Sequence, residues 1–187
     1  LLDGIYNPDS KRRFVQKQSN FTKIPGSPIA YWVSEKVAAL FQKSTLSEIS
    51  FSSPGIRTGR DELFVRDWFE VGITKICFSA KSYADLKRPT IKWYPITRGG
   101  EFRKWYGNND NIILLGNEAI DIRSRGNDYR LRDQEYYFKE GITWTMISSY
   151  RSSFRLNSAG IVYGNGGPTI FFDKNTIHLG ILNSQVV

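Results

Sequence analysis

The chain has 187 residues, of which 40% are hydrophobic and 24% are charged, a composition typical of a globular protein with a substantial core. Lysine and arginine number 26 against 18 acidic residues, and the resulting net charge of +8 favours a polyanionic partner. No apolar run approaches the roughly 20 residues of a membrane helix, so we expect no membrane partner. Cys77 is the only cysteine, which excludes an internal disulfide and favours a reducing, cytoplasmic compartment. His178 is the only histidine, which excludes a metal site built from several histidines.

Residues 1–26 predict an N-terminal linker, because Pro8, Pro25 and Gly26 stand among polar and basic residues. We expect one domain over residues 27–187. It opens with SPIAYWVSEKVAALFQK (27–43), where Ser27 suits the N-cap and Pro28 the first helical position. This predicted helix would pack on a sheet through one apolar face, formed by Ile29, Trp32, Val33, Val37, Leu40 and Phe41.

Short β-like stretches bounded by glycine and proline follow the predicted helix. They are LFVRDWFEVG, ITKICFSA, PTIKWYPI, NIILLG, GITWTMISS, FRLNSAGIVYG and PTIFF. Many strands, few helices and no regular alternation predict a β-rich α+β domain with a mixed sheet. The final TIHLGILNSQVV has helical spacing and then stops without a cap. We therefore expect a truncated C-terminal helix, and with it a piece of a longer protein.

The segment SSPGIRTGRDELF places two glycines, Gly55 and Gly59, around Arg57 and Thr58. Glycines at this spacing allow an exposed loop to present amides, a hydroxyl and arginines to a ligand. An ordinary glycine turn explains the same pattern. It is not a nucleotide-binding loop of the triphosphatase type, because the lysine that should follow the second glycine is missing.

The segment KWYPITRGGEFRKWYGNN (92–109) mixes aromatic and basic residues around the pair Gly99 and Gly100, which lets the backbone turn sharply or approach another segment closely. One interpretation is a twisted hairpin whose cationic stems lie over rings. The other is a nucleic-acid surface. Trp93, Trp105 and Trp144 fit either packing on the sheet or contact with a ligand.

A second basic cluster lies in IDIRSRGNDYRLRD, where we expect a cationic loop around Gly126. Catalytic patterns are scarce. Asp67, Asp85 and Lys87 only loosely resemble the carboxylates and lysine of a metal-dependent nuclease. His178 has no evident acidic partner, so we assign it no catalytic role.

Several unusual strings occur together in order: IPGSPIAYWVSEKVAALF, GIRTGRDELFVRDWFEV, IKWYPITRGGEFRKWYGN, YYFKEGITWTMISS and HLGILNS. Over residues 24–183 they resemble the target-recognition region of PglX-like adenine-specific DNA methyltransferases of BREX phage defence, and related methylase subunits of type II restriction enzymes. One departure stands after Gly59, where many relatives have Asp or Asn and a second polar residue, and this chain has Arg60, Asp61, Glu62 and Leu63.

The resemblance implies a bacterial, cytoplasmic module that selects a sequence in double-stranded DNA, while a catalytic domain of the same parent chain binds S-adenosylmethionine and methylates a flipped adenine. Other defence-complex subunits are possible partners. Asn7 and Pro8 are followed by Asp9, not by the aromatic residue of the family's catalytic tetrapeptide. We therefore expect no catalytic residue, cofactor or metal in this chain. The open alternatives are a methyltransferase-associated nuclease and an RNA- or protein-interaction module with a basic face.

The same resemblance suggests which residues meet DNA. Arg98, Arg103 and Lys104 would contact phosphates, whereas Arg57, Thr58 and the polar groups of ITWTMISS would reach base edges. The complete set of expected DNA-binding residues is Arg57, Thr58, Gly59, Arg60, Arg98, Arg103, Lys104, Asn108, Arg123, Arg125, Arg130, Thr143, Ser148, Ser149 and Arg151.

Overall fold

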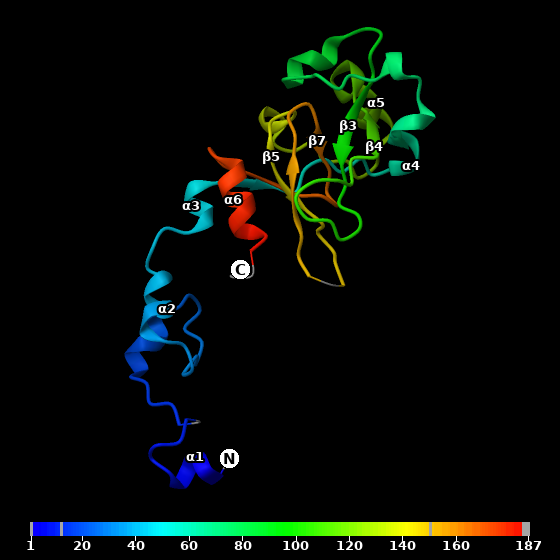
Figure 1. Cartoon of the computed structure of the whole chain (residues 1–187). Helices are drawn as coiled ribbons and strands as arrows, with labels where there is room; N and C mark the ends of the chain where they lie inside the picture. The colour runs from blue at the N-terminus through cyan, green and yellow to red at the C-terminus, as the bar shows by residue number, and fades with distance from the viewer. Residues whose placement is uncertain (1, 12, 150, 185–187) are drawn as a thin grey trace. The chain divides into compact units, whose positions relative to one another are not determined.

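A computed structural model of the chain describes residues 2–11, 13–149 and 151–184. The chain divides into two compact units, Leu1–Ile49 and Ser50–Val187, which Figure 1 colours from blue to cyan and from cyan to red. The boundary between the units follows Ile49, whereas the linker expected from the sequence ends at residue 26. We describe each unit by itself.

The described part of the first unit, residues 2–11 and 13–49, holds four short helical segments: α1 (Leu2–Tyr6), η1 (Gln18–Lys23), α2 (Glu35–Leu40) and α3 (Leu46–Ile49). The predicted long helix over residues 27–43 is wrong. Ser27 has a left-handed backbone with φ 47°, and the helix begins only after Ser34, whose Oγ accepts from the amide of Val37 at 3.3 Å. The predicted buried face is wrong as well, since most of its side chains are exposed: Ile29, Trp32, Val37, Leu40 and Phe41.

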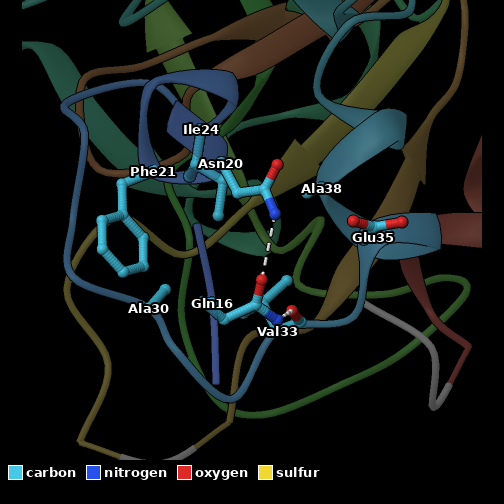
Figure 2. A pocket seen from close by; sticks show the side chains of 8 residues that line it. All are labelled: Gln16, Asn20, Phe21, Ile24, Ala30, Val33, Glu35 and Ala38. Atoms are coloured by element: carbon cyan, nitrogen blue, oxygen red, sulfur yellow. Dashed lines mark hydrogen bonds between the residues drawn. The ribbon is translucent and has the colours of Figure 1, made fainter. Parts of the chain in front are cut away.

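Figure 2 shows the small hollow inside this first unit, which is lined by residues from η1, from α2 and from the segments before each of them. The Gln16 amide donates to the Val33 carbonyl at 3.4 Å and accepts from Asn20 at 3.0 Å, so a polar pair closes one side. The hollow measures about 10 Å³, which is barely the space of one water molecule. It is a packing feature and no ligand site.

The second unit, as described over residues 50–149 and 151–184, contains two four-stranded sheets. The first sheet is antiparallel in the order β1 (Phe51–Ser53), β8 (Thr169–Phe171), β5 (Gly141–Trp144) and β6 (Phe154–Asn157). On one face Ile142 packs with Leu179 of α6 (Asn175–Leu182), which lies against β5 and β6. The opposite face carries a polar row across the four strands, made of Ser53, Thr169, Thr143 and Arg155, all buried.

The second sheet is mixed and runs in the order β2 (Val65–Asp67), β4 (Asn111–Leu114), β3 (Trp93–Thr97) and β7 (Val162–Tyr163). Its strands β3 and β7 pair in parallel, and β4 pairs antiparallel with β2 and with β3. The main core lies here and includes Phe64, Tyr94, Ile113 and Tyr163. The helical segments around this sheet are α4 (Asp61–Phe64), η2 (Trp68–Glu70), η3 (Ile73–Lys75), η4 (Tyr83–Lys87), α5 (Gly116–Arg125) and η5 (Gln134–Tyr136).

The predicted β-rich α+β class is confirmed, and most of the predicted strands are present. The stretch ITKICFSA is an exception, because it forms η3 and contributes only an isolated bridge from Ile76 to Trp93. The stretch FRLNSAGIVYG is two strands, β6 and β7, which join different sheets. The predicted C-terminal helix exists as α6, in which Leu179 and Asn175 are buried, while Ile177 and Ile181 are exposed.

Candidate nucleic-acid interface

The loop GIRTG lies between β1 and α4 and is held against a second segment of the chain. Arg57 and Arg130 exchange two backbone hydrogen bonds, of 2.9 and 2.7 Å. Gly59 has φ +76°, and a Cβ at this position would lie 2.8 Å from the amide nitrogen of Asp128. The loop therefore needs glycine both for its backbone conformation and for this close approach.

The arginines near this loop are paired with carboxylates. Arg57 and Arg130 share Asp128, at 2.6 and 3.1 Å. Arg60 pairs with Glu62 at 2.9 Å and thereby lowers the pKa of that carboxyl, while Arg98 pairs with Asp61. All of these side chains are substantially exposed. Exposed ion pairs contribute little to stability, because water screens them, so a phosphate or a base can replace the carboxylate at little cost.

Two threonines that we expected at base edges are not on the surface. Thr58 is 2% exposed, and its hydroxyl donates to Asp61 and accepts from the amide of Arg60 at 3.2 Å. Thr143 is 1% exposed, because it lies on the inner face of β5 and donates to the carbonyl of Pro168 at 3.0 Å. Their predicted accessibility is wrong, and the physical reason is that both hydroxyls complete internal turns.

A hollow of about 390 Å³ brings together residues from distant parts of the sequence. Arg57, Asp61 and Arg98 line it, together with the turn of residues 164–166. A second hollow of about 300 Å³ shares Asp61 and Arg98 with the first and continues toward β2. The first has the volume of a small-molecule or nucleotide site, with cations on its walls and backbone amides of a glycine turn at its edge.

The loop between β3 and β4 begins with Gly99 and Gly100, at φ +87° and +113°. A Cβ at Gly99 would overlap the carbonyl oxygen of Gly166, and Gly167 would place a Cβ 2.7 Å from the amide of Gly99. The expected sharp turn and close backbone approach are therefore confirmed. Asn108, also expected at the DNA, is half-buried and donates to the Glu101 carbonyl at 2.9 Å.

The aromatic residues of this segment divide into two groups. Tyr94 on β3 is fully buried, donates to the Asp85 carbonyl at 3.1 Å, and has its pKa raised to about 12 by burial. Trp93 and Trp144 are half-buried on the two sheets. Trp105 is 52% exposed and Tyr106 is 63% exposed, so the interpretation of Trp105 as a core residue is wrong. The loop between β3 and β4 therefore exposes aromatic rings to solvent.

The basic residues of the two exposed loops differ in their surroundings. Arg103 is exposed, whereas Lys104 is half-buried and donates to the Asn183 carbonyl at 2.8 Å. Ser148, Ser149 and Arg151 are exposed on the connection between β5 and β6. These residues follow β5 and therefore belong to the same end of the first sheet as Thr145, which donates to the carbonyl of Gly100 at 3.0 Å.

Arg123 and Arg125 are not in the expected loop, because they form the last turn of α5, where cations interact favourably with the helix dipole. Arg123 donates to the Tyr83 hydroxyl at 3.3 Å. Among the described residues, neither arginine lines the hollow at Arg57 and Arg98. A structural role at the end of the helix explains both.

Sequence reasoning missed three features of this surface: the carboxylates Asp61 and Asp128, the turn at residues 164–167, and Arg155. The glycine-rich GNGGP string and the polar alternation of SFRLN were visible signals. Arg155 is fully buried, which no composition rule predicts for an arginine.

The residues of the nuclease alternative have local roles. Asp67 caps η2 and accepts from Asn111 at 2.9 Å, and Asp85 accepts from the amide of Lys81 at 2.7 Å. His178 stacks on Phe172 with ring centroids 4.0 Å apart. Within residues 2–11, 13–149 and 151–184, histidine, cysteine and carboxylate side chains form no group of three that could hold a metal ion. No helix in this part of the chain is long and apolar enough to cross a membrane.

The chain matches no family model. It is nevertheless similar over most of its length to bacterial adenine-specific methyltransferases. One is the adenine-specific methyltransferase PglX of Lacticaseibacillus casei (strain Zhang), 38% identical over 99% of this chain and 16% of that protein. Another is the adenine-specific methyltransferase BrxX of Escherichia coli O9:H4 (strain HS), 36% identical over 84% of this chain and 12% of that protein.

These similarities confirm the resemblance to PglX-like methyltransferases that the strings of the sequence predict. The chain spans only 12–16% of the length of these relatives. It therefore corresponds to one segment of these longer relatives.

Proposed function

We propose that this chain is a DNA-sequence recognition module of an adenine-specific (N6) DNA methyltransferase. The observation that carries the proposal is the convergence of Arg57, Arg98 and the glycine turn 164–166 on one hollow of about 390 Å³. A net charge of +8 supports a polyanionic ligand, and the similarity to PglX and BrxX supports DNA as that ligand.

The residues divide between two tasks. Arg103 and Lys104, on the exposed loop between β3 and β4, contact phosphates and set the register of the protein on the duplex. Arg57 contacts a base edge, because its exposed guanidinium can exchange Asp128 for guanine and offer two donors in the major groove. Thr58 positions Asp61, which in turn holds Arg98 at the hollow.

The module belongs to a parent methyltransferase of bacterial phage defence of the BREX type, active in the cytoplasm. A separate catalytic domain of the same parent chain binds S-adenosylmethionine and methylates the adenine. The segment described here contributes no catalytic residue and holds no cofactor. Other subunits of the defence complex are candidate protein partners.

The proposal is tested by measuring the fluorescence anisotropy of labelled duplex DNA with the purified chain at two salt concentrations. We expect weak binding that falls steeply with salt, by about 0.9 in log K per log salt for each phosphate contacted. Arg103→Ala should lower this slope by about one unit. Lys75→Ala, which removes an exposed cation of η3 outside the hollow, serves as the control and should leave the slope unchanged.

Sequence selection is measured by sequencing the duplexes that the chain retains from a random pool. Wild-type protein should enrich a motif, and Arg57→Ala should relax one position of it, because a lost base contact costs about 1–3 kcal/mol at that position. Arg103→Ala should keep the motif and bind all sequences less tightly. Equal binding of duplex RNA and DNA, or the absence of any salt-dependent DNA binding, would contradict the proposal.

A further inference from the structure

The connection between β5 and β6 extends beyond the first sheet as a hairpin, drawn in gold in Figure 1. Two apolar side chains stand on it: Met146 is 54% exposed and Ile147 is 88% exposed. Both are followed by the exposed Ser148 and Ser149. Ile147 buries almost none of its side chain within the described chain, so its apolar area is available to a partner.

The root of this hairpin lies beside the hollow that Arg57 and Arg98 line. The Met146 amide donates to the Gly166 carbonyl at 3.1 Å, and Gly166 itself lines the hollow. Thr145 donates to the carbonyl of Gly100 at 3.0 Å, at the start of the loop between β3 and β4. The hairpin root, the glycine turn and the basic loop therefore form one connected surface.

Arg155 fixes this arrangement from inside. Its guanidinium is completely buried and donates to the Arg103 carbonyl at 3.4 Å, and to the Ser153 and Thr145 hydroxyls, each at 3.3 Å. Burial, and then the neighbouring charge of Arg103, lower the pKa of Arg155. Arg155 is thus a positioning residue that joins both arms of the hairpin to the loop that carries Arg103.

The basic loop also adds a short strand-like segment beside β6. The Trp105 amide donates to the Phe154 carbonyl at 2.9 Å, and the Leu156 amide donates to the Trp105 carbonyl at 2.8 Å. This pairing places Arg103 and Lys104 along the stem whose far end carries Met146 and Ile147. Strand β6 therefore pairs with β5 on one side and with the loop between β3 and β4 on the other.

The charge of this surface favours nucleic acid over an apolar protein partner. Residues 141–156 contain the exposed Arg151 and no aspartate or glutamate, and the exposed Arg103 lies on the neighbouring loop. An apolar pair next to cations matches a duplex, in which phosphates flank stacked bases. Proteins that deform DNA use isoleucine and methionine side chains in this way, by inserting them between base steps.

We propose that Met146 and Ile147 form an apolar wedge that inserts between base pairs of duplex DNA while the neighbouring cations hold the phosphates. This inference rests on the proposed function, because it requires that the module bind DNA. It adds a deforming contact to the base and phosphate contacts described above. The wedge unstacks a base step beside the sequence that Arg57 contacts.

The experiment combines anisotropy with permanganate oxidation of thymines across a duplex of mixed sequence, since unstacked thymines react and stacked ones resist. The wild-type chain should produce new reactive thymines on binding. The double variant Met146→Ala and Ile147→Ala should lose them and bind about 3–10-fold more weakly. Its salt slope should stay unchanged, because no cation has been removed. Ile73→Ala, which truncates an isoleucine on η3 that is 59% exposed, is the matched control.

The possible failures are distinguishable. Salt-dependent DNA binding without reactive thymines, and with the double variant equal to wild type, would overturn the wedge and leave the recognition module standing. No DNA binding by the wild-type chain would overturn both. A double variant that binds DNA normally but no longer associates with the catalytic part of the parent enzyme would show that the apolar pair contacts protein, and would also overturn the wedge.

Discussion

The hollow at Arg57 and the hairpin at Arg155 use arginine in opposite ways. At the hollow the guanidinium groups are exposed and paired with Asp61 and Asp128. At the hairpin root the guanidinium of Arg155 is fully buried, and among the described residues no carboxylate pairs with it. An arginine in an exposed ion pair can change its partner at little cost in free energy, whereas a buried cation depends on the hydrogen bonds that replace its hydration. The first region is suited to changing partners and the second to fixing a shape.

The two regions meet where glycine backbones touch, at residues 98–100 and 164–167. Neither segment has side-chain bulk at the contact, so the two turns approach more closely than ordinary residues permit. Gly166 joins the two regions, because it accepts from the Met146 amide at the hairpin root and also lines the hollow. Each prediction below alters either the contact or one of the regions on its two sides.

The largest expected effect comes from Gly166→Ala. Its Cβ would overlap the carbonyl oxygen of Arg98, and because that oxygen belongs to the backbone and cannot move aside alone, the two turns must separate. We expect a loss of about 2–3 kcal/mol in the free energy of unfolding, measured by urea denaturation. Gly72→Ala is the matched control, because a Cβ there meets nothing within 4 Å and φ is −57°. It should be neutral or stabilise by about 0.4–1 kcal/mol. Equal midpoints for both variants would mean that the turns do not pack tightly.

The next effect is at Arg155, where charge and geometry can be separated. Arg155→Lys keeps a cation but replaces the planar guanidinium, whose two terminal nitrogens reach separate acceptors, by a single ammonium nitrogen, so we expect a loss of about 1–2 kcal/mol in unfolding free energy. Arg155→Met removes the cation at similar volume and should be less destabilising, because no buried charge needs solvation. If the methionine variant is the less stable one, the hydrogen bonds of the guanidinium outweigh its desolvation.

The lysine variant also has a predictable dependence on pH. Burial lowers the pKa of a cationic group in the folded state, as it does for Arg155 itself. The unfolded chain then binds more protons than the folded one, so the stability of Arg155→Lys should rise with pH below the unfolded pKa of lysine, about 10.4. Urea midpoints at pH 7 and pH 9 check this sign. The methionine variant should show no such difference from wild type.

The sequence predicted the class of the fold and the glycine turns better than it predicted the helix at residues 27–43. The predictions of strands and of glycine turns rest on short stretches of sequence, and most of them were confirmed. The helix pattern was also local, but Ser27 turned left-handed and the apolar side chains remained exposed, which no short-range rule reveals. For the site, basic residues were visible, while burial of Thr58 and the carboxylate partners depends on segments far apart in the chain. The resemblance to a family could not supply those partners either.

The smallest expected effect tests the exchange of partners at the hollow. Asp128→Asn preserves the shape of the side chain but removes the charge that holds Arg57 and Arg130. Stability should change by no more than about 1 kcal/mol, because both ion pairs are exposed, and duplex DNA should bind about 2–5-fold more tightly at low salt. Screening should remove this gain at high salt. Asp173→Asn makes the same charge change at an exposed position after β8 and should give a smaller gain. Equal gains would attribute the effect to net charge alone. Weaker binding by Asp128→Asn, with loss of the selected motif, would mean that the carboxylate orients Arg57 for its base instead of competing with DNA for it.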